Sequence, residues 1–312
     1  MTPTPIILDC DPGHDDAIAI LLAVASPELD LRAVTTVSGN QTLDKTTNNA
    51  LRVLELAGRT DIPVYAGADA PFVRQRDVAA HVHGESGLDG PDLPQPSQSQ
   101  QAEHAVESLA QAYRGPEKPV LVATGPLTNV GLLFATHADA RPERIILMGG
   151  SIGEGNTTAS AEFNIIADPE AADVVFRSGV PITMIGLDVT HQALLDRDSA
   201  AELRALGNVS GRVAAELTDF ALDRNMEWSG STTTAIHDAV AIAHLMVPDL
   251  VAVAPYHVAV DTTNGPARGR TICDGLPYRL KRDGRTPNAD VGIVIDRARF
   301  ERLLIDAFAR LP

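Results

Sequence analysis

Short runs of β-branched and aliphatic residues alternate with longer amphipathic segments along most of the chain, and this alternation most constrains the fold. The strand-like runs cover 5–10, 31–37, 63–67, 119–125, 144–150 and 181–188, with helical stretches such as 15–25 and 43–58 between them. This order predicts an α/β fold: a doubly wound, mostly parallel central sheet with helices on both faces. Strand-like runs after residue 250, closed by a final helix from about 297, predict antiparallel strands at one edge.

The length and the hydrophobic content favour one large domain. The chain has 312 residues, of which 44% are hydrophobic, and it contains no internal repeat or linker-like stretch. Two segments, 68–100 and 222–234, depart from the strand and helix pattern. We therefore predict a single domain over 1–312, with a long flap loop near 68–100 and a second mobile segment near 222–234.

Charge and cysteine content exclude several classes of partner. The formal net charge is −16, and no basic stripe interrupts it, so we expect no nucleic-acid partner. The two cysteines, Cys10 and Cys273, are far apart and lack metal-type spacing, which favours a reducing compartment. The N-terminus does not resemble a signal peptide, and no stretch approaches the length of a membrane span. We expect a cytoplasmic protein with no membrane partner.

The stretch LDCDPGHDD, at 8–16, places four aspartates directly after the first predicted strand. The helix dipole would stabilise acids in the first turn by only about 0.3–1 kcal/mol each, whereas partly buried carboxylates a few ångströms apart repel one another at least as strongly. A divalent cation relieves that repulsion, and Ca²⁺ accepts several carboxylate and carbonyl oxygens. The simpler interpretation is helix capping beside a solvated turn, but capping needs one acid. We favour a metal site.

The same stretch allows a second function. A strand that ends in Asp-x-Asp is also how haloacid-dehalogenase-like phosphatases present an aspartate nucleophile beside Mg²⁺. Here a second acidic pair, Asp15 and Asp16, follows the first, and this pair distinguishes the two interpretations. The metal-dependent phosphatase is kept as an alternative.

Further polar residues follow other predicted strands. Because carboxyl ends of parallel strands meet at one edge of a sheet, one pocket can collect them there. The candidates are Asn40, Thr124, Met148, Asn156, Glu162, Asn164, His237 and Asp238. Asp168 precedes Pro169 and is typical of a helix N-cap with proline at the next position.

Seven segments, taken in order, resemble the inosine–uridine-type nucleoside hydrolases from about residue 5 to the last helix. They are DCDPGHDDA, TTVSGNQT, HVHGESG, ATGPLTN, LMGG, EGNTTASAEFNI and IHDAVA. The resemblance implies calcium-dependent hydrolysis of the N-glycosidic bond of ribonucleosides, by a metal-activated water, to free base and ribose. It also implies a homodimer or homotetramer and a role in purine and pyrimidine salvage.

The resemblance assigns a role to each matching residue. It makes Asp11, Asp16, Asp238 and the carbonyl of Thr124 the calcium ligands, with Asp11 also the general base. It places Asp15, Asn40 and Asn164 on the ribose 2′- and 3′-hydroxyls, Asn156 and Glu162 on the 5′-hydroxyl, and Met148 beneath the sugar. It places the catalytic His237 near the leaving base and His83 on the flap above it.

The preferred base is open between inosine/uridine-type and broader specificity. The purine-specific branch carries tryptophan directly before the helix aspartate, where this chain has His237. Trp228 could stack on the base or plug the core, and we favour the plug. A carboxylate of Glu162 facing the 5′ position would repel a 5′-phosphate, so we expect nucleosides rather than nucleotides as substrates.

A non-catalytic, calcium-dependent riboside-binding protein is a further alternative. A protein that only binds needs neither a base at the water nor a proton donor at the leaving group. Asp11 and His237 therefore argue against it.

Overall fold

In the computed structural model, which describes residues 2–312, one nine-stranded sheet forms the centre and a separate two-stranded sheet lies beside it. In spatial order the large sheet consists of β10 (Thr271–Asp274), β9 (Val251–Val260), β11 (Ala289–Ile295), β6 (Ile182–Ile185), β5 (Ile145–Met148), β4 (Val120–Ala123), β1 (Thr4–Cys10), β2 (Leu29–Thr36) and β3 (Val64–Ala66). The small sheet pairs β7 (Leu194–Leu195) with β8 (Thr234–Ala235).

The large sheet is parallel from β3 through β11, and β9 and β10 add an antiparallel edge. Alternate residues of β1 face opposite hydrophobic cores: Ile6 and Leu8 pack into one, and Ile7 packs into the other. A strand buried on both faces explains the uninterrupted apolar run at the start of the chain. The predicted mostly parallel, doubly wound fold is confirmed.

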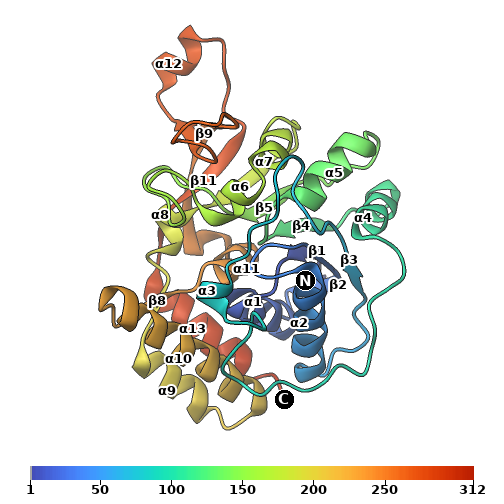
Figure 1. Cartoon of the computed structure of the whole chain (residues 1–312), viewed down its shortest axis with the longest axis vertical. Helices are drawn as coiled ribbons and strands as arrows, with labels where there is room; N and C mark the ends of the chain where they lie inside the picture. Colours follow the sequence, from blue (N-terminus) through green and yellow to red (C-terminus); the bar gives the residue numbers. More distant parts are fainter. Residues whose placement is uncertain (1) are drawn as a thin grey trace.

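Helices cover both faces of the sheet (Figure 1). One core contains residues of α1 (His14–Ala25), α2 (Leu43–Leu56), α9 (Arg197–Ala205), α10 (Val209–Ser229), α11 (Asp238–Met246) and α13 (Arg297–Phe308). The other core contains residues of α4 (Ala105–Arg114), α5 (Thr128–Thr136) and α7 (Pro169–Phe176). The short elements are α3 (Ala80–His83), α6 (Phe163–Ala167), α8 (Leu187–Thr190), the 3₁₀ turn η1 (Pro248–Leu250) and α12 (Pro277–Arg282).

The strand order places a crevice at the end of β1. From β1 the chain builds outward to β2 and β3 on one side, and then returns to build β4, β5 and β6 on the other. Connections that leave adjacent strands in opposite directions open a crevice beyond their carboxyl ends. Asp11 follows β1 and Thr124 follows β4, so the chain places both residues at this crevice.

The two expected irregular segments differ in outcome. Between β3 and α4 the chain is long and carries only the short helix α3. The expected break at 222–234 is wrong for its first eight residues, because α10 continues to Ser229 and ends at Gly230, which has a φ of 70°. Residues 222–229 contain no proline or glycine, and a glycine at the C-cap ends the helix.

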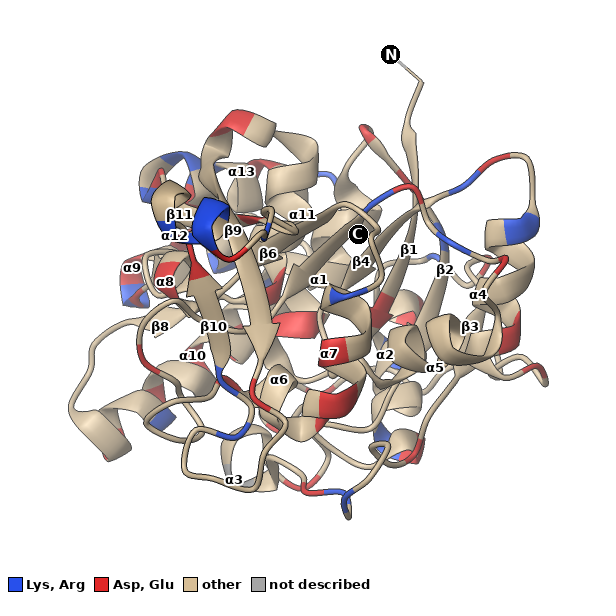
Figure 2. Cartoon of the chain, turned by 90° about the horizontal axis from the view of Figure 1, so that it is seen from above, with Lys and Arg blue, Asp and Glu red and all other residues tan. Residues whose placement is uncertain are grey.

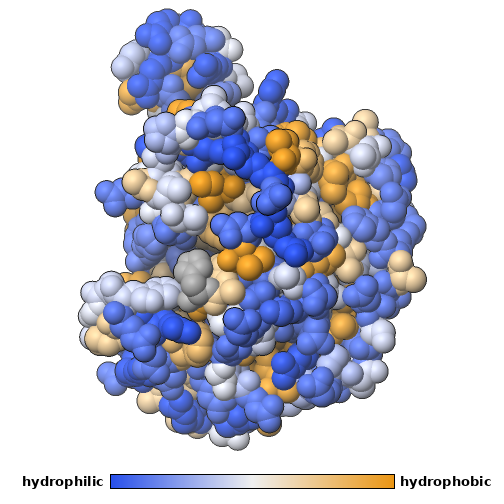
Figure 3. All heavy atoms as spheres, viewed as in Figure 1, coloured by the Kyte–Doolittle hydropathy of each residue, from blue (hydrophilic) through white to orange (hydrophobic). Residues whose placement is uncertain are grey.

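The surface is largely hydrophilic in the view of Figure 3, with a few separate apolar patches. Along the ribbon in Figure 2, Lys and Arg positions are interspersed with Asp and Glu positions. Within residues 2–312, no helix is long and apolar enough to cross a membrane.

Candidate active site

A cavity of about 690 Å³ lies beyond the carboxyl ends of the parallel strands. Its floor includes the start of α1, the residue after β4 and the last residue of β5, and its outer wall includes the flap and the end of α10. The sequence-predicted residues in its lining are Asp15, Asn40, His83, Thr124, Met148, Asn156, Glu162, Asn164, Trp228, His237 and Asp238. Segments far apart in the sequence thus meet around one space.

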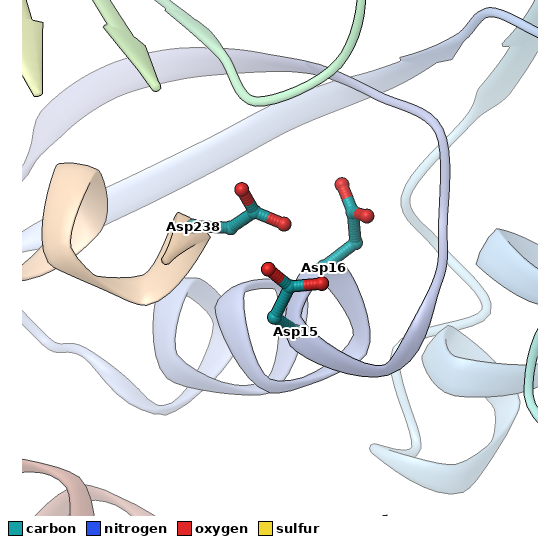
Figure 4. A group of neighbouring side chains, drawn as sticks. All are labelled: Asp15, Asp16 and Asp238. Atoms are coloured by element: carbon teal, nitrogen blue, oxygen red, sulfur yellow. The ribbon is translucent and has the colours of Figure 1, made fainter. Parts of the chain in front are cut away.

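Three carboxylates meet at the floor of this cavity. Asp15 and Asp16 lie in the first turn of α1, and Asp238 is the first residue of α11; one oxygen of each lies within 4.8 Å of the others (Figure 4). Burial, and then the charge of Asp15, raises the pKa of Asp16 to about 7, and the same two causes raise the pKa of Asp238 well above its usual range. This acidic cluster could hold a metal ion.

Asp11 is fully buried beside the cluster, just beneath the cavity lining. Its Oδ2 accepts a hydrogen bond of 2.6 Å from the backbone N–H of Asn40, while its Oδ1 has no hydrogen-bond partner. Burial and the charge of Asp16 raise the pKa of Asp11 well above its usual range. A buried carboxylate oxygen without a partner is destabilising unless a cation or a proton satisfies it, so Asp11 fits a metal site.

Two glycines leave room for the Asp11 carboxylate. A Cβ atom at Gly39 would lie 2.2 Å from Asp11 Oδ2, and a Cβ atom at Gly125 would lie 2.7 Å from Asp11 Oδ1. Neither position can take a larger residue without moving Asp11. The requirement for glycine in SGN and TGP follows from this close approach.

Thr124 contacts the cluster through two groups. Its hydroxyl donates to Asp16 Oδ1 over 3.0 Å, and its carbonyl accepts from the Asn164 side chain over 2.7 Å. A carbonyl oxygen has a second lone pair, which is the one that a cation would use. Thr124 therefore places a neutral oxygen, which could bind a cation, beside the carboxylates.

The two asparagines assigned to the sugar also donate hydrogen bonds to other residues of the site. The amide of Asn40 donates to the carbonyl of Asp11 over 3.2 Å and to Asp16 Oδ2 over 3.1 Å. The amide of Asn164 binds the carbonyl of Met148 over 3.1 Å as well as that of Thr124. Asn40 thus helps to orient Asp16, whereas Asn164 holds two main-chain carbonyls.

Glu162 is almost completely buried, and its carboxylate is held by backbone amides. Oε1 accepts from the N–H of Asn164 at 2.9 Å, and Oε2 accepts from those of Gly150 and Ile165 at 2.9 and 3.2 Å. Burial nevertheless raises its pKa to about 7. Asn156 is exposed at the rim, where its Oδ1 accepts from the N–H of Phe163 over 3.0 Å.

His237 lies immediately before Asp238 at the start of α11. Its Nδ1 is 2.8 Å from the hydroxyl of Thr190, and its ring meets that of His191 edge to face, with the centroids 5.7 Å apart. Burial lowers the pKa of His237, so the neutral imidazole prevails near pH 7. A neutral imidazole still carries one N–H with which it can donate a hydrogen bond.

His83 closes α3 on the flap, and its ring contacts a residue that sequence reasoning did not single out. Its Nδ1 lies 3.2 Å from Nδ1 of His14, and the two rings stack with centroids 5.4 Å apart. His14 also stacks on Phe220 of α10, at 4.5 Å. The only signal for His14 in the sequence was its position inside the aspartate motif.

Two expectations about single residues have opposite outcomes. The interpretation of Trp228 as a core plug is wrong, because 52% of its surface is exposed. Trp228 lines the rim of the cavity and lies in the last part of α10, after Leu222, the last buried residue of that helix. Asp168 is the N-cap of α7, as expected, and its Oδ1 accepts from the N–H of Ala171 over 3.1 Å.

Asp9 does not join the metal cluster, although it belongs to the same aspartate stretch. Its Oδ1 accepts from the hydroxyl of Thr35 over 2.6 Å and from the amide of Asn129 over 2.8 Å. Both partners lie on the sheet and helix side of β1, outside the cavity lining. Asp9 therefore links β1 to β2 and α5 beneath the site through Oδ1, while its Oδ2 has no hydrogen-bond partner.

Comparison with known proteins gives a consistent result. The model of the family "Inosine-uridine preferring nucleoside hydrolase" matches residues 6–302. The chain is 52% identical to the pyrimidine-specific ribonucleoside hydrolase RihA of Shewanella sp. (strain ANA-3), over 98% of this chain and 96% of that protein. It is 49% identical to the protein of the same description from Citrobacter koseri, over 98% of both chains.

Among solved structures, the chain resembles a purine-preferring ribonucleoside hydrolase from Gardnerella vaginalis. The TM-score is 0.91 and the identity 33%, with 98% of each chain covered. These matches cover the segments that form the cavity and the acidic cluster. They exclude the two alternative functions, a phosphatase and a non-catalytic binding protein. The chain belongs to the inosine-uridine preferring nucleoside hydrolase family and is a nucleoside N-ribohydrolase.

Proposed function

We propose that this enzyme hydrolyses pyrimidine ribonucleosides in preference to purine ribonucleosides, with Ca²⁺ as its metal. The relatives at about half identity are described as pyrimidine-specific, whereas the structural neighbour described as purine-preferring is only 33% identical. The chain is thus more similar overall to proteins described as pyrimidine-specific than to this structural neighbour. The similarity therefore supports a preference for uridine and cytidine.

The observation that carries the proposal is the buried carboxylate cluster at the cavity floor. We assign Asp11, Asp16, Asp238 and the carbonyl of Thr124 as the ligands. This set contains only oxygen atoms and includes both carboxylates and a carbonyl, which Ca²⁺ accepts in flexible geometry. When bound, the ion would lower the pKa of a water molecule and bind hydroxyl groups of the sugar.

Asp11 is the general base in this proposal. Its Oδ2 is fixed by the backbone N–H of Asn40, which leaves Oδ1 to take a proton from the attacking water. The C–N bond to the base then breaks as the water oxygen bonds to the anomeric carbon. The sugar carries positive charge as this happens, and the surrounding carboxylates stabilise that charge.

The sugar is held by residues on both sides of the cluster. We propose that Asp15, Asn40 and Asn164 bind the 2′- and 3′-hydroxyls, and that Asn156 and Glu162 bind the 5′-hydroxyl. Met148 would pack beneath the ring, as the last residue of β5 in the cavity lining. His237 would donate a ring N–H to the leaving base, with Thr190 fixing its orientation, while His83 and Trp228 contact the base from the flap and from α10.

Three broader proposals rest on family resemblance. We propose that the enzyme works as a homodimer or homotetramer, that it acts in the cytoplasm, and that it salvages purine and pyrimidine bases. We also propose that 1–312 acts as one catalytic domain whose segments 68–100 and 230–234 move during turnover. Light scattering coupled to size-exclusion chromatography measures the assembly directly.

The experiment that tests the main proposal is release of free ribose from uridine, cytidine, inosine and adenosine at equal concentration. We expect kcat/KM to be highest for uridine or cytidine, to vanish with a chelator and to return with Ca²⁺. Faster release from inosine would contradict the pyrimidine preference while leaving the hydrolase intact. Recovery with Mg²⁺ but not with Ca²⁺ would contradict the choice of ion.

A further inference from the structure

A column of four stacked side chains crosses three segments that line the cavity. The guanidinium carbon of Arg224 lies 5.3 Å from the centroid of the Phe220 ring. Phe220 stacks on His14 at 4.5 Å with an interplanar angle of 9°, and His14 stacks on His83 at 5.4 Å with an angle of 23°. Arg224 and Phe220 belong to α10, His14 to α1 and His83 to the flap helix α3. The column therefore joins the outer wall of the site to its floor.

His14 also makes polar contacts with the flap at two points. Its Nε2 is 2.8 Å from the carbonyl of Asp89, and because a carbonyl only accepts, Nε2 carries a hydrogen. Its Nδ1 is 3.2 Å from Nδ1 of His83, and its backbone N–H donates to the same nitrogen over 3.4 Å. Only 6% of His14 is exposed. Its ring is thus fixed at both ends of the segment 83–89.

The turn 84–89 is already fixed from the opposite side, by α2 and the residues before it. The side chains of Gln41 and Asn49 donate to the carbonyls of Gly84 and Ser86, each over 2.9 Å. The Asp89 carboxylate accepts from the N–H of Ser86 over 3.0 Å and closes the turn.

The preceding part of the flap is bonded mainly to itself. The N–H of Val82 bonds the carbonyl of Ala79, and that of Gly84 bonds the carbonyl of Ala80. Residues 77–79 and 82–83 line the cavity. His14 is therefore placed at the junction between the fixed turn and the segment that covers the site.

We propose that His14 is a positioning residue that holds flap residues 77–83 over the base end of the cavity. The inference rests on the proposed function, because it concerns how a nucleoside is enclosed in the same site. His14 is adjacent to Asp15 and Asp16 in the first turn of α1, so the flap takes its position from the element that carries the acids. The ring does not touch the reacting atoms, and its effect is on substrate binding more than on the chemical step.

Two substitutions separate stacking from hydrogen bonding. His14→Phe keeps the stack between Phe220 and His83 but removes both ring nitrogens. His14→Gln removes the stack but can restore an N–H donor to the Asp89 carbonyl. His257→Phe is a matched control. His257 lies on the antiparallel strand β9, and its Nδ1 is 2.9 Å from the main-chain carbonyl of Thr286.

The first measurement is hydrogen exchange of the Ca²⁺-loaded enzyme without nucleoside. In His14→Phe we expect amides of 77–84 to exchange about tenfold faster, the factor given by loss of one ordinary hydrogen bond. Exchange elsewhere, and exchange in His257→Phe, should match that of the unmodified chain. Unchanged exchange in 77–84, or faster exchange throughout the chain, would overturn the proposal.

The second measurement is the steady-state kinetics of uridine hydrolysis. We expect KM to rise about tenfold in His14→Phe with kcat changed less than about threefold, and His14→Gln to recover part of the loss. A fall in kcat at constant KM would overturn the proposal, because it would place His14 in the chemistry. If exchange changes as expected but no nucleoside is cleaved even by the unmodified chain, the positioning role stands and the proposed function fails.

Discussion

Replacing Glu162 with glutamine should change stability by an amount that depends on pH. The carboxylate accepts three backbone hydrogen bonds in a nearly water-free setting, yet burial holds its pKa at about 7 against an ordinary 4.5. Between these values the folded state binds a proton that the unfolded state does not. The contribution of the Glu162 carboxyl to the free energy of unfolding is therefore fully present below pH 4.5 and is lost as pH rises through 7.

The magnitude follows from two opposing effects. A shift of about 2.5 units corresponds to about 3 kcal/mol of destabilisation of the ionised group above pH 7, which glutamine avoids. Glutamine replaces one acceptor oxygen with an NH₂ group and so loses at least one hydrogen bond, about 1–2 kcal/mol. The pKa of about 7 already includes the hydrogen bonds to the ionised form, so near pH 8 the variant should be more stable than the wild type by about 1–2 kcal/mol. At pH 5 the wild-type carboxyl is protonated and carries no ionisation penalty, and the variant should be less stable by about 1–2 kcal/mol.

Urea unfolding of both proteins at pH 5, 6.5 and 8 measures the difference in their free energies of unfolding. The titrating groups that the two proteins share contribute equally to both values and so cancel in this difference. Glu154→Gln is the control, since Glu154 is an exposed carboxylate on the same loop, and its difference should not vary with pH. A difference for Glu162→Gln that is the same at all three pH values would refute the reasoning. It would show that the carboxyl has an ordinary pKa in the folded protein.

Other predictions concern the metal and the substrate. Asp11→Asn should reduce kcat for uridine by at least about 10²-fold with an unchanged circular dichroism spectrum, because it removes the base; substantial activity would exclude Asp11 from the mechanism. A chelator should lower Tm and added Ca²⁺ should restore it, because the ion binds only the folded cluster. In Asp238→Asn the difference in Tm with and without Ca²⁺ should be smaller. Uridine 5′-monophosphate should be cleaved far more slowly than uridine, and Glu162→Gln should narrow the gap; comparable rates in the unmodified enzyme would remove Glu162 from the 5′ position.

The fold and most of the cavity lining could be predicted from the sequence, because both follow from local patterns. Apolar runs of strand length separated by helices define a doubly wound sheet, and polar residues after those strands must meet at one edge. The limit of α10 was harder to predict. The polar composition of 222–229 suggested a loop, but its residues form helix readily, and Gly230 alone marks the end.

Contacts between distant segments account for what the sequence could not predict. Nothing local distinguishes Asp9 from Asp11: each follows an apolar residue near the end of β1, and residues two apart on a strand project to the same side. The difference is one of position. Asp9 still lies within β1, where Thr35 and Asn129 donate to its Oδ1, whereas Asp11 lies beyond the strand beside the acidic cluster, and each of the two keeps one oxygen without a hydrogen-bond partner. Ligand assignment therefore depends on where each carboxylate lies relative to the end of the strand.

The same argument explains why the aspartate stretch is compatible with folding. Of its four acids, Asp9 is hydrogen-bonded inside the sheet, and Asp11 and Asp16 accept backbone N–H groups from Asn40 and Gly13. Asp15 is partly exposed, so only part of the negative charge is concentrated in the dry interior. Burial, and then repulsion from the neighbouring carboxylates, raise the pKa values of Asp16 and Asp238, and both effects can be relieved by a proton or by a cation. Competition between these two at one site predicts that Ca²⁺ affinity falls as pH is lowered below 7, with protons released on binding. Calorimetric Ca²⁺ titration in two buffers of different ionisation enthalpy measures that release, and equal heats in both would contradict it.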